Sequence, residues 1–378
     1  MSKDRRRISR RGSESSAVLL DLNNLMEFRH LSFARFVRFA IVYATGEDPF
    51  NKPIDNPLPI LDDVKGLVDS LMSDVEKRYE KVGNSRLKKA VEAEKEELEE
   101  ILTKISSDQE EKLNTSFFMD YEFKEYVRIW GGRGRVVRDI LKARSYVLGL
   151  YELGMYLTRI ARGENAFLLV EPNYYLHYYN KVLDIDGFRK FYLGIRDFMK
   201  YHEEIQRQGG NHKLGETAFL TLLSGLAIDK LFELLRGKHG YDQIYSEIMD
   251  LVNNGALVLH RVSESGVTTY DLTNLAKVVL KMRVADALAD IAKSLQTYHS
   301  GGRHDVENYV ANLANIIGGN IFAYAIGKDL RHIYYTVRSI VAGSFDEDMN
   351  KALGAEGWAK LKSKLLSMKV VAWQKELQ

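Results

Sequence analysis

Apolar residues recur every three or four positions over two consecutive stretches of this chain. These positions are Leu61, Val64, Val68, Leu71, Val75 and Val82 in the first stretch, and Leu87, Val91, Leu98, Ile101 and Ile105 in the second. Such spacing places one apolar stripe along each of two α-helices. Gly83-Asn84-Ser85 between them supplies a helix stop and a new N-cap. The sequence therefore predicts a long helical hairpin of coiled-coil type over residues 61–112.

Two polar residues interrupt these apolar stripes. Arg78 occupies one position of the first stripe, and Glu94 occupies one position of the second. The exposed faces carry the acidic run Glu92–Glu100. This pattern is typical of a solvated helical hairpin, and a hairpin that docks a partner protein is the alternative.

In most of the remaining chain, apolar residues also recur at the spacing of a helix. The segment 47–60 is an exception, because its prolines remove backbone donors and restrict the preceding residues, so we expect a linker or a strap there. The expected further helices are residues 17–45, 117–163, 187–236, 273–298 and 303–340, with a last helix near 355–375.

Two regions predict strands rather than helices. Ala166–Val170 predicts a short strand. Ala256–Val262 and Val267–Leu272 are separated by the turn Ser263–Gly266, and they predict a β-hairpin over residues 256–272.

These patterns predict a mainly α fold, namely a multi-helix two-lobed protein with a long helical hairpin and one small β-hairpin. We expect residues 1–16 to form a flexible basic arm. Residues 17–163 are then an N-terminal helical lobe that includes the 61–112 hairpin. Residues 164–378 are a C-terminal helical lobe that includes the β-hairpin.

Composition excludes several classes of site. The 378 residues include no cysteine, which excludes disulfides, thiolate metal sites and cysteine nucleophiles. The net charge of +2 means that contact with a polyanion depends on local clusters of charge. No apolar run approaches the roughly 20 residues of a membrane span. We expect an intracellular protein, cytoplasmic or nuclear, or a virion component, with no secretion and no membrane contact.

The first sixteen residues concentrate positive charge. Arginine-rich arms of this kind neutralise phosphates without reading sequence. A solubilising tail or a nuclear-import signal is the alternative. The arginines are Arg5, Arg6, Arg7, Arg10 and Arg11.

A second basic cluster surrounds the glycine loop Gly131–Gly134. A helix starting near Arg135 would present basic residues on one face and apolar residues on the other. Backbone N–H groups at the loop and the flanking guanidinium groups suit phosphates, and a solvated basic face is the alternative. We expect Arg144, on the apolar side, to form an ion pair or to snorkel. The candidate phosphate-binding residues are Lys124, Arg128, Arg133, Arg135, Arg138 and Lys142.

Residues 242–273 resemble the last part of a winged-helix module, in which a recognition helix precedes a β-hairpin wing. The stretch Tyr270–Thr273 is similar to the end of a wing strand. This resemblance implies reading of the DNA major groove by residues such as Gln243 or Ser246. The chain between Arg236 and Tyr241 is too short for the extra helix of the full module, so a plain helix–hairpin unit is the alternative.

The pattern Arg196-Asp197-x4-His202 resembles the signature of HEPN ribonucleases, which are all-α dimers. The resemblance implies that Arg196 and His202 act on an RNA backbone. Both lie on a continuous predicted helix, about 120° apart. His202 falls on the apolar stripe, which favours a histidine at the edge of the core.

Other motifs predict no metal and no cofactor. His299 and His304 flank a glycine turn, and only Asp305 is a candidate to complete a metal triad with them. The tyrosines Tyr174, Tyr175, Tyr178 and Tyr179 are candidates for base stacking or for core and interface anchors.

The function that we expect is non-enzymatic, sequence-independent binding of nucleic acid, RNA in preference to DNA. In outline the chain resembles nucleoproteins and coat proteins of viruses, which implies homo-oligomers that exchange arms such as 1–16 or 47–60. The alternatives are a HEPN-like ribonuclease that uses Arg196 and His202, and a helical interaction scaffold.

Overall fold

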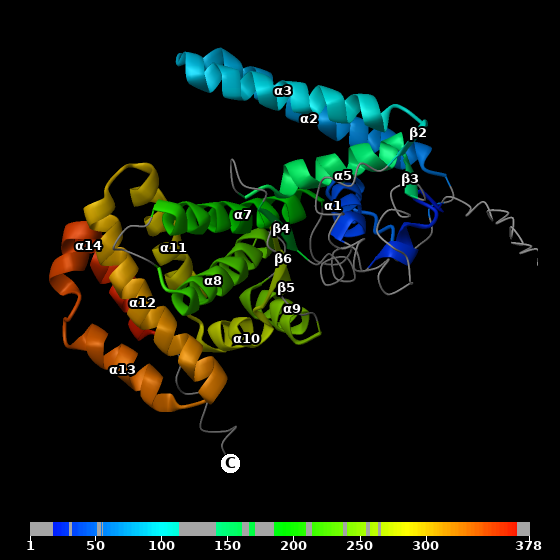
Figure 1. The fold of residues 1–378 in the computed structure, drawn as a ribbon. Coiled ribbons are helices and arrows are strands. Elements are labelled where there is room, and N and C mark those ends of the chain that lie inside the picture. Colours follow the sequence, from blue (N-terminus) through cyan, green and yellow to red (C-terminus); the bar gives the residue numbers. More distant parts are fainter. Residues whose placement is uncertain are drawn as a thin grey trace, which may run out of the picture. The chain divides into compact units, whose positions relative to one another are not determined.

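The computed structural model describes residues 18–29, 32–50, 54, 56–112, 141–160, 166–170, 185–208, 214–236, 240–254, 258–263 and 266–368. Within these residues it contains twelve α-helices and six short strands, which confirms the mainly α class. The chain divides into two compact units, Met1–Gly154 and Met155–Gln378. Figure 1 labels the elements of both units.

The first unit combines helices with a small sheet. In the sheet the strand order is β1-β3-β2, with β1 parallel and β2 antiparallel to β3. The elements are β1 (Val18–Leu20), the 3-10 helix η1 (Leu25–Phe28), α1 (Ser32–Thr45), α2 (Leu58–Lys81), α3 (Ser85–Ile105), β2 (Glu110–Lys112), β3 (Leu141–Arg144) and the first part of α5 (Ser145–Thr158).

The helical hairpin predicted for residues 61–112 is present as α2 and α3, which run side by side in Figure 1. Asn84 is the N-cap of α3, and its side chain accepts a hydrogen bond from the Arg86 N–H. The two polar interruptions of the stripes meet, since Arg78 Nη2 lies 2.8 Å from Glu94 Oε1. The second helix ends at Ile105, earlier than predicted, because Glu110–Lys112 pairs with β3.

The predicted helix 17–45 is correct only in its second part. Its first part contains β1 and η1, because local side chains offer the backbone other partners. The side chain of Asn24 accepts from the Asp21 N–H and donates to the Leu19 carbonyl, so the chain turns there. α1 ends at Thr45, and Gly46, with a φ of 76°, donates its N–H to the Val42 carbonyl oxygen.

The described part of the segment 47–60 packs on its own unit. Asp48 pairs with Arg38 of α1, and both side chains are 3% exposed. The Arg38 guanidinium also lies 4.6 Å from the centre of the Phe50 ring. α2 begins at Leu58, inside the predicted linker, because Pro59 stands in the first turn, where a missing N–H breaks no helical bond.

The predicted helix 117–163 is wrong at residues 141–144. These residues form β3, the central strand of the sheet, which pairs with β1 on one side and β2 on the other. Backbone hydrogen bonds to two neighbouring strands outweigh the local helical spacing here. The helix resumes as α5 at Ser145, and residues 113–140 lie outside the described residues.

The second unit consists of helices packed around α8 and of a second small sheet. Its sheet has the antiparallel order β4-β5-β6, so the predicted strand and β-hairpin are confirmed. The elements are the end of α5, β4 (Phe167–Val170), α7 (Ile185–Gln208), α8 (Glu216–Leu235), α9 (Tyr241–Asn254), β5 (Val258–Ser263), β6 (Gly266–Asp271), α10 (Thr273–Met282), α11 (Ala285–Ser300), α12 (His304–Gly327), α13 (Leu330–Val341) and α14 (Asp346–Leu366).

α8 is the central helix of this unit. It contacts α7, α9, α10, α11 and α12, and most of its residues are buried. Close approach of α12 depends on Gly318, because a Cβ atom there would lie 2.8 Å from Ala218 Cα of α8. At the same crossing, Thr221 Oγ1 lies 3.0 Å from the Gly318 carbonyl oxygen.

Both long helices predicted after the β-hairpin are divided. Arg283, with a φ of 56°, ends α10, and Lys328, with a φ of 55°, ends α12. After the second break the side chain of Asp329 caps α13. The apolar spacing continues across each break because both helices of a pair pack on the same core, so periodicity alone does not reveal the divisions.

The last helix begins earlier than predicted. α14 starts at Asp346 and contains a kink at Gly354, whose φ is 73°. The predicted break at Ser300–Gly302 is confirmed between α11 and α12. Among the described residues, α12 alone has the length and apolar composition of a membrane-spanning helix. Half of its apolar window is buried in the protein, and its packing on α8 and α11 accounts for this composition.

Two adjacent glycines of α12 give a matched test of the α8–α12 contact. Gly318→Ala should lower the free energy of unfolding by about 1–3 kcal/mol, because the new methyl group meets the α8 backbone. Gly319→Ala should change it little or raise it by up to about 1 kcal/mol, since its nearest neighbour, Thr217 Oγ1, is 3.8 Å away. Urea unfolding of both variants checks this. Equal effects of the two substitutions would contradict the packing described.

Candidate nucleic-acid interface

Lys142 is the one predicted phosphate-binding residue that falls within the described part of the chain. It lies on β3 rather than on a helix face, and its Nζ is 3.1 Å from Glu110 Oε2. Arg144 Nη1 donates to the Asp108 carbonyl oxygen and lies 3.7 Å from Asp108 Oδ1, so it is ion-paired as expected. The other candidates are outside the described residues: Arg5, Arg6, Arg7, Arg10, Arg11, Lys124, Arg128, Arg133, Arg135 and Arg138.

Arg196 and His202, the residues of the ribonuclease hypothesis, both lie on α7 as expected. Arg196 Nη1 donates to the Leu157 carbonyl oxygen at 2.9 Å. The His202 ring stacks on Phe219 of α8, with 3.8 Å between ring centres, and its Nε2 lies 3.3 Å from the Gln206 amide nitrogen. These contacts hold both side chains against their own unit. The ribonuclease hypothesis stays a prediction.

The segment that resembles a winged helix consists of α9 and the hairpin β5–β6. α8 ends at Leu235 and α9 begins at Tyr241, so the described chain has no room for a further helix between them. Gln243 is exposed and donates to Glu247, and Ser246 is also exposed. Groove reading by these residues remains a hypothesis. The tyrosines 174–179 lie outside the described residues.

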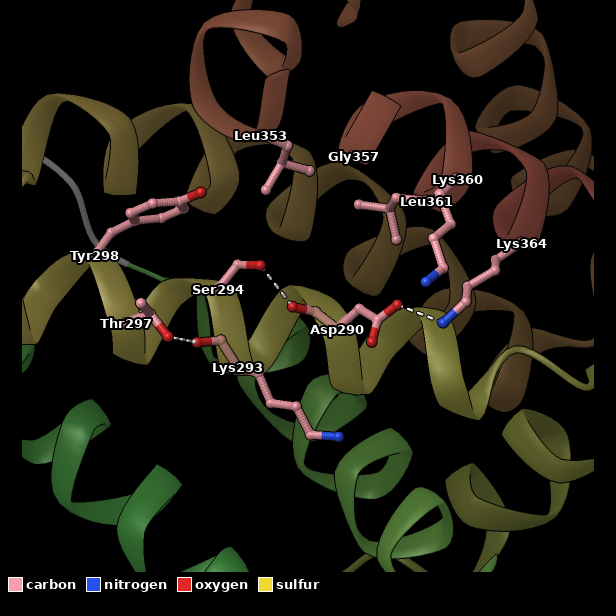
Figure 2. Close-up of a pocket in the computed structure, with 10 residues that line it drawn as sticks. All are labelled: Asp290, Lys293, Ser294, Thr297, Tyr298, Leu353, Gly357, Lys360, Leu361 and Lys364. Atoms are coloured by element: carbon pink, nitrogen blue, oxygen red, sulfur yellow. Dashed lines mark hydrogen bonds and ion pairs between the residues drawn. The ribbon is translucent and has the colours of Figure 1, made fainter. Parts of the chain in front are cut away.

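A polar pocket of about 330 Å³ lies between α11 and α14 (Figure 2). Lysines line it, but aspartates compensate most of their charge. Lys364 Nζ is 2.5 Å from Asp290 Oδ2, and Lys293 Nζ is 2.9 Å from Asp229 Oδ2. Lys360 is the remaining cation of the lining. With this balance of charge the pocket does not point to an anionic ligand.

α13 presents a different kind of surface. Its inner side buries Ile333, Thr336 and Ile340, and the helix packs on α12 and α14. The opposite side, which we call the α13 outer face, consists of Arg331, Tyr334, Tyr335 and Arg338. At helical spacing these four residues span an arc of about 100°, with both arginines between the two tyrosines.

Both tyrosines of the α13 outer face are unusually exposed. Tyr334 is 61% exposed and Tyr335 is 53% exposed. Their ring centres lie 6.1 Å apart, with 62° between the ring planes. Two exposed aromatic rings side by side mark this face as a candidate contact surface.

The charge of the α13 outer face is positive. α13 itself contains no Asp or Glu. Arg331 pairs with Asp329 through Nε and Nη2, and these hydrogen bonds lower the pKa of the Asp329 carboxyl to about 2. Arg331 is 79% exposed, and exposed ion pairs of this kind are weak enough to exchange for a phosphate. Arg338 has no ion pair with any residue that the structure describes.

Aromatic rings beside guanidinium groups can hold a nucleic-acid strand. Bases stack on exposed tyrosines in a sequence-tolerant way, and arginines contact the phosphates on either side. Sequence reasoning missed this face because residues 303–340 read as one helix. The available signal was an acid-free helical stretch with adjacent tyrosines, but only the fold decides which side of α13 faces solvent.

No protein-family model, no curated protein and no solved structure matches this chain significantly. The functional assignment therefore depends on the chemistry of the side chains, and the α13 outer face is the strongest candidate for nucleic-acid contact among the described residues.

The burial of His202 can be tested through the pH dependence of stability. Burial lowers the pKa of His202 to about 4 from its ordinary 6.5. Between these pH values the unfolded chain binds a proton that the folded chain does not, so this residue makes stability fall as pH falls. When the pH is lowered from about 7 to about 4.5, the free energy of unfolding of the wild type should fall. In His202→Phe this fall should be smaller by about 2–3 kcal/mol. Urea unfolding at both pH values measures the difference. Identical pH dependence would contradict the burial.

Proposed function

We propose that this chain binds single-stranded nucleic acid without sequence preference, as a non-enzymatic binding protein. The observation that carries the proposal is the α13 outer face, in which two exposed tyrosines flank two exposed arginines on a helix without acidic residues. The proposal commits to nucleic acid because base stacking and phosphate contact together use every side chain of this face.

The two residue types have separate roles. Each tyrosine would stack on one base, which is worth about 1–3 kcal/mol per base. The arginines would neutralise phosphates, which gives the affinity a dependence on salt. Neither contact reads a base edge, so the expected binding is independent of sequence.

The basic arm 1–16 and the segment 124–142 would make further phosphate contacts of their own. Such contacts suit a protein that coats RNA or DNA. We propose RNA as the ligand in preference to DNA. Exchange of arms between copies of the chain would then build the coat. We assign this exchange to residues 1–16, because Asp48 and Phe50 in the segment 47–60 pack on α1 of their own unit.

Fluorescence anisotropy with labelled oligo(U) and oligo(dT) tests the proposal. Tyr334→Ala combined with Tyr335→Ala should weaken binding at least about tenfold through loss of stacking. Arg331→Gln combined with Arg338→Gln should reduce the slope of log affinity against log salt by about 0.7 per lost phosphate contact. The matched control is Lys351→Gln with Lys360→Gln on α14, which removes the same charge from another helix.

Two outcomes would contradict the proposal. If the α13 variants bind both oligonucleotides like the control, the α13 outer face does not bind nucleic acid. If neutralising Arg133, Arg135 and Arg138 together lowers the salt slope by less than about one, the sequence-predicted basic segment makes no phosphate contacts. Equal affinity for oligo(U) and oligo(dT) would remove the preference for RNA and leave the rest of the proposal intact.

A further inference from the structure

Two histidines and a glutamate converge where α11 gives way to α12. His299 lies in the last turn of α11, His304 begins α12, and Glu307 lies one turn further on. The ligand atoms of the three side chains all lie within 4.8 Å of one another. Within the described residues, this is the one group of histidine and acidic side chains with such mutual spacing.

The turn between the helices brings the three residues together. Gly302 has a φ of 67°, which favours glycine, and the Arg303 N–H donates to the Tyr298 carbonyl oxygen at 2.9 Å. This reversal places the start of α12 beside the end of α11. On α12, His304 and Glu307 are three residues apart and share a face, whereas Asp305, about 100° away from His304, is exposed.

The separations between each histidine and Glu307 match those in a metal coordination sphere, and the two histidine ligand atoms lie within 4.8 Å of each other. His299 Nδ1 lies 3.2 Å from both Glu307 oxygens, and His304 Nδ1 lies 3.1 Å from Glu307 Oε2. A tetrahedral ion with bonds of about 2.0–2.1 Å needs ligand atoms about 3.3 Å apart. The present contacts are therefore close to those that a bound ion requires.

Residues of α7 support the group from behind. The Tyr201 hydroxyl donates to Glu307 Oε1 at 3.0 Å, and burial together with the Glu307 carboxylate raises the pKa of Tyr201, so it keeps its proton. On the other side of the His299 ring, Nε2 lies 3.5 Å from Glu204 Oε2. A carboxylate behind a ligating histidine is the usual support of a metal-bound imidazole.

His299 thus lies between two carboxylates, Glu307 and Glu204. With a metal ion on Nδ1, the ring N–H would lie on Nε2, the side of the ring that faces Glu204.

We propose that His299, His304 and Glu307 form a binding site for a divalent transition-metal ion of the Zn²⁺ type. Imidazole and carboxylate ligands suit this class of ion. His304 is 61% exposed, so the ion would keep at least one coordination position open to water. The site is independent of the α13 outer face, since it uses the opposite end of α12.

The test measures metal binding directly on the full chain. Protein treated with chelator and then dialysed is titrated with Co²⁺, whose visible absorption reports tetrahedral ligation, and Zn²⁺ is then added to displace it. We expect one equivalent of Co²⁺ to bind and one equivalent of Zn²⁺ to remove the absorption.

Two variants and a matched control assign the ligands. His304→Ala removes an exposed ligand and should weaken Zn²⁺ binding at least about tenfold, and Glu204→Gln, behind His299, should weaken it about 10- to 100-fold. Asp305→Asn changes the adjacent exposed carboxylate and should leave affinity within about twofold of wild type. Circular dichroism establishes that each variant is folded.

Three results would overturn the proposal. The first is a wild-type chain without tetrahedral Co²⁺ absorption, which would leave the three side chains as a cluster of mutual contacts that binds no metal. The second is a folded His304→Ala variant that binds Zn²⁺ like wild type. The third is loss of binding in Asp305→Asn equal to that in His304→Ala. None of these measurements involves nucleic acid. A result against the metal site would therefore not count against the α13 proposal, and the reverse also holds.

Discussion

Close packing of α8 against α11 and α12 is the contact on which the second unit depends. Gly225 of α8 lies against Leu288 of α11, and Gly318 of α12 lies against Ala218 of α8, with no space for an added Cβ at either glycine. Short separations between helix axes bury the apolar sides of three helices at once. They hold α12 in place; its first turn carries one candidate site, and its last residue leads into α13, which carries the other.

α12 connects the two candidate sites of this unit. Its first turn carries His304 and Glu307, and after its last residue, Gly327, the chain turns into α13. Across 24 helical residues the two ends are about 36 Å apart. A metal ion at one end would hold α7, α11 and α12 together, whereas the α13 outer face at the other end is available for a ligand. The two sites would therefore have separate roles.

Local sequence patterns predicted much of the fold. The stripes of α2 and α3, the Asn84 cap and the β5–β6 hairpin are all present, since each depends on spacing and turn residues within a short window. The predictions failed at residues 18–20 and 141–144, where strands pair with distant partners. They also failed at Arg283 and Lys328, because non-glycine residues in the left-handed conformation leave no recognisable signal.

By itself the sequence determined the helical class, the hairpin, the small second sheet and the positions of several helix ends, because propensity, capping and periodicity are local properties. Tertiary structure alone decided which side chains meet and which face solvent. It placed Glu307 rather than Asp305 beside His299, and it left Tyr334 and Tyr335 uncovered while burying Ile333 and Ile340. The physical reason is that the direction of a helix face is set by the core on which it packs, and that core is assembled from residues far apart in the chain.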